Sequence, residues 1–136
     1  MRHTTFPRIA AAATLASALA VGGSLGTADA TKTVRIKSHI SIKAKGLKFR
    51  GRVTSSNAGC KPGRTVVLYR KFSDGTRQRL GTDTTGPKGV WKINVSGSAG
   101  ITMARFVAKV KTRREGTAGT IFVCKGAHSR TIFYQP

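Results

Sequence analysis

Side chains able to do acid–base chemistry are few and widely spaced in this chain. After residue 30, the carboxylate side chains are Asp74, Asp83 and Glu115. Catalysis by paired carboxylates requires two of them to converge on one bond, whereas Asp74 and Asp83 stand in or beside predicted turns. We interpret Asp83 as a turn or strand-edge acid that accepts hydrogen bonds from nearby backbone N–H groups. No catalytic residue is therefore expected.

The histidines and cysteines show no clear nucleophile or metal pattern. His128 and Ser129 are adjacent, but neighbours in a strand point to opposite faces, so they make a poor base–nucleophile pair. Cys60 and Cys124 supply half of a structural zinc set, and neither His39 nor His128 stands at a clear ligand spacing from them. Calcium requires several clustered oxygen ligands, which the few acids do not provide. The sequence predicts no enzyme activity, no metal and no cofactor.

The first 30 residues have the pattern of a secretory signal peptide. Arg2 and Arg8 make the start basic, residues 9–21 are apolar and uncharged, and residues 28–30 (ADA) have the small-x-small form of a cleavage site. The apolar run is shorter than the about 20 residues of a membrane span, and an uncleaved N-terminal anchor is the alternative. We expect a secreted protein, extracellular or associated with the cell wall, whose residues 31–136 form a single β-sandwich domain.

Two cysteines in a secreted chain indicate one disulfide, and Cys60 and Cys124 can pair in only one way. The bond would stabilise the fold by about 4 kcal/mol in the chain-entropy model. That contribution matters because a chain of roughly 100 residues has a thin core. A metal-binding pair and a reactive thiol are the alternatives. We predict the disulfide, with Cα atoms within about 7 Å of each other.

Hydrophobic alternation predicts strands along the whole chain after residue 30, and no helix. In residues 33–45 apolar side chains fall on even positions and basic side chains on odd positions, and the phase flips at Gly46. We therefore expect residues 33–45 and 47–55 to form a hairpin or a bent pair. Further strands are expected at 64–72, 77–84, 91–95, 102–111, 120–125 and 129–134, with loops at 55–59, 96–100 and 112–119.

The central turn is expected in residues 81–91, GTDTTGPKGVW. Pro87 fixes φ near the value that the second position of a type I or II turn requires, and Gly86 and Gly89 tolerate positive φ. Apolar and polar residues alternate from Trp91 onward, which is typical of a half-buried strand. The segment is predicted to be a hairpin that opens its second strand on a buried tryptophan.

This turn resembles the thr-asp-x-x-gly-x-aromatic hairpin of carboxypeptidase regulatory-like domains, which are transthyretin (prealbumin)-like β-sandwiches. Residues 51–54 (GRVT) and 63–68 (GRTVVL) resemble the family's first strand and its gly-x-x-val-x-leu strand, in the same order. The resemblance covers roughly residues 47–111. Residues 100–103 (GITM) replace the usual gly-x-tyr start of a strand, and the cysteines are extra to the general pattern. The resemblance implies a prealbumin-like sandwich that serves as an accessory, non-catalytic module.

The fold that these observations predict is an all-β, immunoglobulin-like (prealbumin-like) Greek-key sandwich of about seven or eight strands with one disulfide. Short strands at regular spacing, a buried tryptophan and one long-range disulfide all favour this architecture.

Net charge is the strongest functional signal. The chain has 25 Lys and Arg against 4 Asp and Glu, a formal charge of +21, and removal of residues 1–30 leaves about +20 because two Arg and one Asp are lost. Outside the cell, wall polymers, acidic polysaccharides, phospholipid headgroups and released nucleic acid are anions that such a charge attracts. We predict weak electrostatic binding to anionic extracellular polymers, through Arg77, Arg79, Lys109, Lys111, Arg113 and Arg114.

Two other functions stay open. The basic pair Arg113-Arg114 in the expected loop 112–119 would suit the pocket of a trypsin-like protease, as in a protease inhibitor, or would serve a small antimicrobial protein. A structural surface module with no specific ligand is the second. Sequence-specific nucleic-acid binding is not expected, because we find neither a recognition helix nor a sheet with stacking aromatics. No segment after residue 30 is apolar and long enough to span a membrane.

Overall fold

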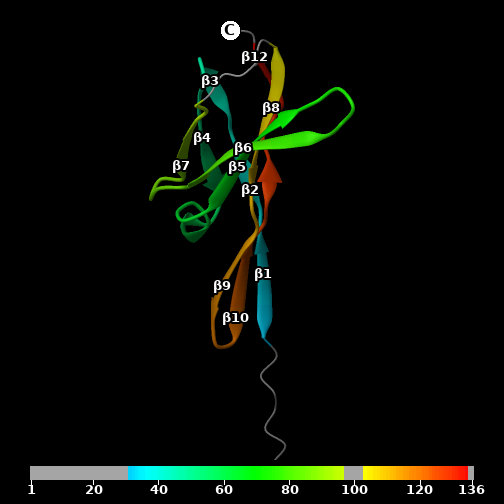
Figure 1. Ribbon diagram of the computed structural model, residues 1–136. Helices are drawn as coiled ribbons and strands as arrows, with labels where there is room; N and C mark the ends of the chain where they lie inside the picture. The colour runs from blue at the N-terminus through cyan, green and yellow to red at the C-terminus, as the bar shows by residue number, and fades with distance from the viewer. Residues whose placement is uncertain (1–30, 97–102, 135–136) are drawn as a thin grey trace, which may run out of the picture.

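The computed structural model describes residues 31–96 and 103–134, and the chain in these ranges is built of short strands (Figure 1). The predicted signal peptide, residues 1–30, and most of the predicted 96–100 loop lie outside the described residues. One turn of 3₁₀-helix, η1, spans Ala58–Cys60. The strands are β1 Lys32–Ile36, β2 Ser38–Ile40, β3 Lys43–Lys45, β4 Lys48–Ser55, β5 Thr65–Lys71, β6 Arg77–Thr84, β7 Val90–Asn94, β8 Ala104–Val110, β9 Arg113–Thr117, β10 Thr120–Cys124, β11 Ala127–His128 and β12 Ile132–Tyr134.

Two antiparallel sheets pack face to face. In the first, here the β4 sheet, β4 lies between β7 on one side and β2 and β3 on the other. In the second, the β5 sheet, β5 lies between β6 and β8, and β11 and β12 pair with the far side of β8. The ring of Phe49 from β4 lies 4.7 Å from that of Phe106 from β8, centroid to centroid. The predicted all-β sandwich with one disulfide is confirmed.

The strands are more numerous than the seven or eight predicted, because expected strands are interrupted and the expected loop at 112–119 contains a strand. The segment expected as one strand at 33–45 becomes β1, β2 and β3. Its predicted pairing with 47–55 is confirmed for β2 and β3, and Gly46 takes φ of 57° at the turn into β4. Within the segment expected as a strand at 129–134, residues 132–134 form β12, and the short strand β11 precedes this segment at residues 127–128.

The turn in residues 81–91 joins the two sheets, so its prediction as the tip of a paired hairpin is wrong. Among the described strands, β6 pairs with β5 and β7 pairs with β4. After the turn the chain pairs with β4, beginning where the Val53 N–H donates to the Gly89 carbonyl at 2.8 Å. Gly89 has φ of 77°, and a Cβ there would clash with the Val53 carbonyl oxygen. The crossing carries Trp91 between the sheets, where it is buried as predicted.

The prediction of a loop at 112–119 is also wrong. Residues 113–117 form β9, which pairs with β10 through a two-residue turn, so that Thr117 faces Thr120. Gly119, with φ of 96°, allows that tight turn. On its other side β10 pairs with β1 in parallel. The polar composition of 112–119 suggested a loop, but β9 is the edge of a small sheet, where polar side chains face water.

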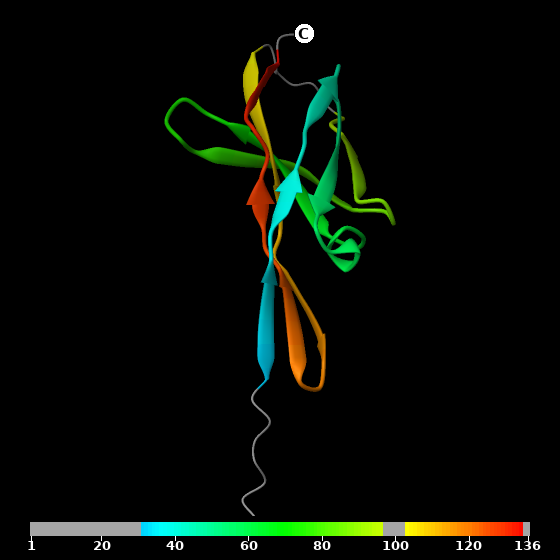
Figure 2. The same ribbon diagram turned by 180° about the vertical axis from the view of Figure 1, so that it is seen from behind.

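This third sheet, β1-β10-β9, projects away from the sandwich (Figures 1 and 2). Three chain segments connect it to the sandwich, where β1 continues into β2, β8 into β9 and β10 into β11. The links are Lys37, residues 111–112 and residues 125–126. We call this junction the neck.

Candidate anion-binding surface

Arg64, the residue before β5, is the best-buried cation of the described chain, with 0% of its surface exposed. Its guanidinium lies in the neck and donates hydrogen bonds to a ring of oxygen atoms from segments that meet there. The acceptors are the Ser38 hydroxyl (3.0 Å) and the backbone carbonyls of Cys60 (2.8 Å), Lys111 (2.8 Å), Cys124 (3.2 Å) and Lys125 (3.0 Å). Arg64 therefore ties the projecting sheet, η1 and the sandwich together.

No carboxylate is among the hydrogen-bond acceptors of the Arg64 guanidinium. Burial, and secondarily the charge of Arg113, hold the pKa of Arg64 below its ordinary value. Carbonyl and hydroxyl dipoles stabilise the charge in place of a counter-ion, as buried polar groups require. Arg64 is thus a structural residue, and no anion from solution reaches it.

The predicted disulfide lies beside Arg64. Cys60 and Cys124 are bonded, with Cα atoms 5.5 Å apart, and both are buried. The predicted pairing is confirmed. The disulfide links η1 to the end of β10, so it covalently closes the same neck that Arg64 closes by hydrogen bonds.

The predicted binding residues fall into two groups. Arg77, Arg79 and Lys109 share the outer face of the β5 sheet, because Arg79 lies opposite Tyr69, Arg77 opposite Lys71, and Lys109 opposite Val67. The structure does not place the other three predicted cations on that face, since Lys111 belongs to the neck and Arg113 and Arg114 to β9.

Arg113 is engaged within the protein. It donates to the carbonyl oxygens of Pro62 at 2.6 Å and Gly59 at 2.7 Å, and it forms an ion pair with Glu115 at 3.0 Å. Because its guanidinium is occupied, we leave Arg113 out of the binding surface. The same contacts, and the position of Arg113-Arg114 in a strand, offer no support for a protease-inhibiting loop.

A larger basic surface lies on the outer face of the β4 sheet. Along β4, Lys48, Arg50 and Arg52 point outward, and the core residues Phe49 and Val53 alternate with them. The neighbouring strands add cations at the same level: Lys45 faces Lys48, and Lys43 and Lys92 flank Arg50 on its two sides. Directly opposite residues share a face about 5 Å apart, so these like charges repel one another.

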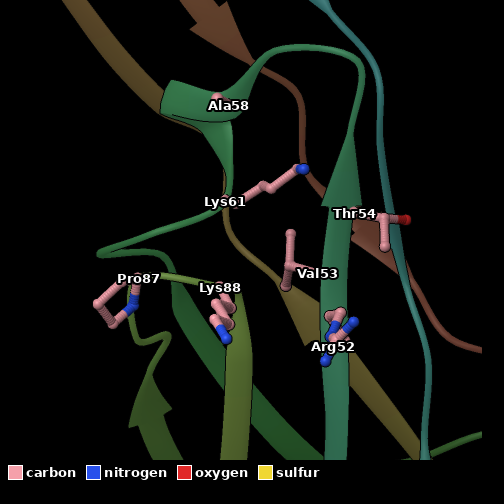
Figure 3. Close-up of a pocket in the computed structure, with 7 residues that line it drawn as sticks. All are labelled: Arg52, Val53, Thr54, Ala58, Lys61, Pro87 and Lys88. Atoms are coloured by element: carbon pink, nitrogen blue, oxygen red, sulfur yellow. The ribbon is translucent and has the colours of Figure 1, made fainter.

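Three shallow hollows follow one another along this face and share residues. One of about 160 Å³ lies among Lys45, Lys48, Arg50 and Lys92. The next, of about 250 Å³, is lined in part by Arg50 and Arg52. The third, of about 370 Å³, lies between Arg52 and the turn residues Lys61 and Lys88, as Figure 3 shows. We call this row of hollows the β4 track; its cations are Lys43, Lys45, Lys48, Arg50, Arg52, Lys61, Lys88 and Lys92.

No acid in the described part of the chain forms an ion pair with a cation of the β4 track. Among the described residues the one ion pair is that of Arg113 with Glu115. Asp83 accepts a 2.7 Å hydrogen bond from the backbone N–H of Lys92, as expected for a strand-edge acid. Asp74 accepts from the N–H and the hydroxyl of Thr76 at the β5–β6 turn, and these bonds lower the pKa of Asp74. The structure therefore does not bring the three acids together.

The sequence already contained part of the signal for the β4 track, namely the outward basic positions of residues 33–45 and of Lys48, Arg50 and Arg52. The pairing of β3 and β7 with β4, and the approach of Lys61 and Lys88, come only from the tertiary structure. In the part of the chain that the structure describes, no group of three or more His, Cys, Asp or Glu residues could hold a metal ion. No helix there is long and apolar enough to cross a membrane.

Comparison with known proteins adds no family to this description. The sequence matches no protein-family model, and the search of curated proteins finds no significant relative.

Proposed function

We propose that this protein is a secreted, non-catalytic module that binds anionic extracellular polymers electrostatically, principally along the β4 track. The partners would be cell-wall polymers, acidic polysaccharides or nucleic acid. The observation that carries the proposal is the continuous row of hollows along β4, lined by eight Lys and Arg side chains. Those side chains have no ion pair among the described residues.

The geometry suits a linear polymer better than a small anion. β4 contains eight residues, so it extends for roughly 26 Å at about 3.3 Å per residue. Cations stand on both sides of β4 along this length. The hollows are open and shallow, and the aliphatic stems of lysine and arginine form much of their walls while the charged ends reach water. Such a surface can bind along the charged backbone of a polymer without recognising the order of its units.

Electrostatics provide the driving force. Like charges directly opposite in a sheet are destabilising, and a bound polyanion relieves that repulsion while it releases its own counterions. Because both effects are screened by salt, binding should be weak at physiological ionic strength and strong at low salt.

The test removes three cations from the β4 track and three from elsewhere. The track variant is Lys43→Ser, Arg50→Ser and Lys92→Ser together. The control is Lys32→Ser, Arg35→Ser and Lys125→Ser, three exposed cations of the projecting sheet and the neck. Binding to dextran sulfate is measured from about 20 mM to 500 mM salt.

We expect the track variant to bind more weakly and to flatten the slope of log affinity against log salt by up to about one per cation removed. The control variant has the same net charge and should keep a slope close to that of the unmodified protein. Equal losses in both variants, or tight binding that survives about 1 M salt, would contradict the β4 track as the binding surface.

A further inference from the structure

Exposed apolar side chains, two of them aromatic, gather at one end of the β5 sheet, where β5 ends, β8 begins and β12 pairs with β8. Phe133 (61% exposed), Met103 (56%) and Phe72 (38%) are among the exposed large apolar side chains of the described residues. All three line one hollow of about 290 Å³. The remaining exposed large apolar side chains of that part of the chain, Val90 and Phe122, lie on other sheets. Apolar side chains scattered singly over a surface need no explanation, whereas a cluster of them does.

Cations surround these rings in a regular order. Phe133 of β12 lies opposite Arg105 of β8, Arg105 lies opposite Lys71 of β5, and Lys71 lies opposite Arg77 of β6. One row across the sheet therefore reads aromatic, cation, cation, cation. Lys71 and Arg105 also line the hollow. No acid belongs to this row or is among the residues that line the hollow.

Arg70 adds a second kind of contact. Its guanidinium carbon lies 5.0 Å from the centroid of the Phe72 ring, within the range of a cation–π interaction. Phe72 is held at the end of β5, where its N–H donates to the Thr76 carbonyl at 2.9 Å and its carbonyl accepts from the Gly75 N–H at 3.1 Å. The ring is therefore anchored through its backbone while its face stays in contact with solvent and a guanidinium.

We propose that this hollow is a stacking site for single-stranded nucleic acid, with bases on Phe72 and Phe133 and phosphates on Lys71, Arg105 and Arg77. Proteins that bind single strands without sequence preference combine such aromatic platforms with a basic groove. The inference rests on the proposed function and names the polymer that this second face selects. It requires no sequence readout, because every base offers a flat face to a ring.

The shape of the site favours binding of a flat nucleobase over binding to a membrane surface. The apolar side chains line a concave hollow with cations beside them, and its volume of about 290 Å³ is at the lower end of the range for ligand pockets. A membrane-binding tip would instead present its apolar side chains to the bilayer with the charges set back at the headgroups.

The experiment compares two phosphate polyanions: a 15-nucleotide deoxythymidine oligomer, and inorganic polyphosphate of about 15 units, which has neither bases nor sugars. Each is titrated, at about 150 mM salt, into the protein with residues 1–30 removed. The variants are Phe72→Ala, Phe133→Ala and the double change. Phe122→Ala is the matched control, since Phe122 is a similarly exposed phenylalanine on the projecting sheet. Trp91 fluorescence reports that each variant is folded, because Trp91 is buried.

We expect each ring removed from the hollow to weaken oligonucleotide binding by about fivefold or more. Polyphosphate binding should be unchanged in all variants, and Phe122→Ala should bind both polymers normally. Oligonucleotide binding that survives the double change, or an equal loss for polyphosphate, would overturn the stacking site and leave the proposed function standing. If the unmodified protein binds neither polymer even at about 20 mM salt, both proposals fail.

Vesicles with about 30% anionic phospholipid provide the remaining arm. A loss of vesicle binding in the double variant, with oligonucleotide binding intact, would assign the hollow to a membrane surface and overturn the inference.

Discussion

The guanidinium of Arg64 donates a 2.8 Å hydrogen bond to the carbonyl oxygen of Cys60, so the buried cation and the disulfide stabilise the same junction. The other hydrogen bonds of Arg64 reach all three chain connections of the neck. Ser38 directly follows the β1–β2 link, Lys111 belongs to the β8–β9 link, and Cys124 and Lys125 lie where β10 leads into the β10–β11 link. This arrangement stabilises the neck in a chain with almost no carboxylates. Substitution of Arg64 therefore tests how much these hydrogen bonds contribute to the stability of the neck.

Replacing Arg64 should destabilise the fold severely. Arg64→Met leaves a hydroxyl and several carbonyl oxygens without their donor, and each buried polar group left unpaired costs about 1–3 kcal/mol. We expect a loss of about 3–5 kcal/mol in the free energy of unfolding, because several buried acceptors lose their donor at once, and Arg64→Lys should recover only part of it because lysine lacks the planar fork. Urea denaturation measures both. Arg114→Met, the same change at an exposed site, should stay within about 0.5 kcal/mol, and a similar loss there would contradict the role of Arg64.

Removing the disulfide should have an effect of comparable size. A bond that closes 64 residues of sequence is expected to stabilise by about 4 kcal/mol. Each kcal/mol changes Tm by about 4–8 °C in a domain of this size. Cys60→Ala with Cys124→Ala should therefore lower Tm by well over about 10 °C in thermal unfolding. Reduction of the unmodified protein should produce the same change, and two free thiols by mass spectrometry of non-reduced protein would refute the bond.

Reversing the charge of Arg50 should stabilise the free protein. Arg50 is flanked by Lys43 and Lys92, and Arg50→Glu converts two repulsive cross-strand pairs into attractive ones, each worth roughly 0.2–1 kcal/mol. The free energy of unfolding should rise at low salt, and the gain should shrink at about 0.5 M salt through screening. Arg130→Glu makes the same change in net charge at an exposed residue outside the strands. A gain as large in that variant would attribute the effect to net charge alone.

Gly51→Ala should disrupt the core. A Cβ at residue 51 would clash with the Ser41 carbonyl oxygen and would lie 2.7 Å from Trp91 Nε1. The backbone and the indole cannot both move without breaking the sheet, so we expect a loss above about 4 kcal/mol, which is exceptional for a single substitution. Trp91 fluorescence during denaturation measures it. Gly86→Ala, where the nearest atom to the new Cβ is 4.0 Å away, should be tolerated, and equal damage there would contradict the steric explanation.

Acidification should lower the stability of the free protein and strengthen its binding to an anionic polymer, both through protonation of His128. Burial, and then the charges of Lys109, Arg77 and Lys71, lower the pKa of His128. Because the unfolded chain keeps a pKa of about 6.5, it binds the proton first, so stability falls as the pH drops through about 6.5 towards the folded-state value. An oligonucleotide bound at the hollow of this sheet, beside Lys71 and Arg77, should raise this pKa, and binding should tighten as His128 becomes charged.

An NMR titration of His128, with and without the 15-nucleotide deoxythymidine oligomer, checks both statements. Phosphodiester groups do not titrate in this range, so any change belongs to the protein. A free-protein pKa at or above about 6.5 would contradict the first statement, and a pKa that the oligomer leaves unchanged would contradict the second.

The sequence by itself determined the properties that depend on neighbouring residues and on counts. Alternation of apolar and polar residues predicted most strands, including β6 at Arg77–Thr84 with its correct bounds, because side chains in a strand alternate between the two faces. Two cysteines allowed one pairing, and the strand-edge role of Asp83 follows from an acid beside a turn. The burial of Trp91 follows from the same alternation.

Only the tertiary structure decided which strands meet. Whether residues 81–91 form a paired hairpin or cross between sheets depends on β4, and whether 112–119 form a loop or a strand depends on β10. Arg64 gave no sequence signal, because its partners are mostly backbone carbonyls, which every residue carries. The β4 track and the hollow at Phe72 and Phe133 bring together residues far apart in the chain. Alternation is a local property, whereas pairing follows from burial and hydrogen bonding over the whole chain.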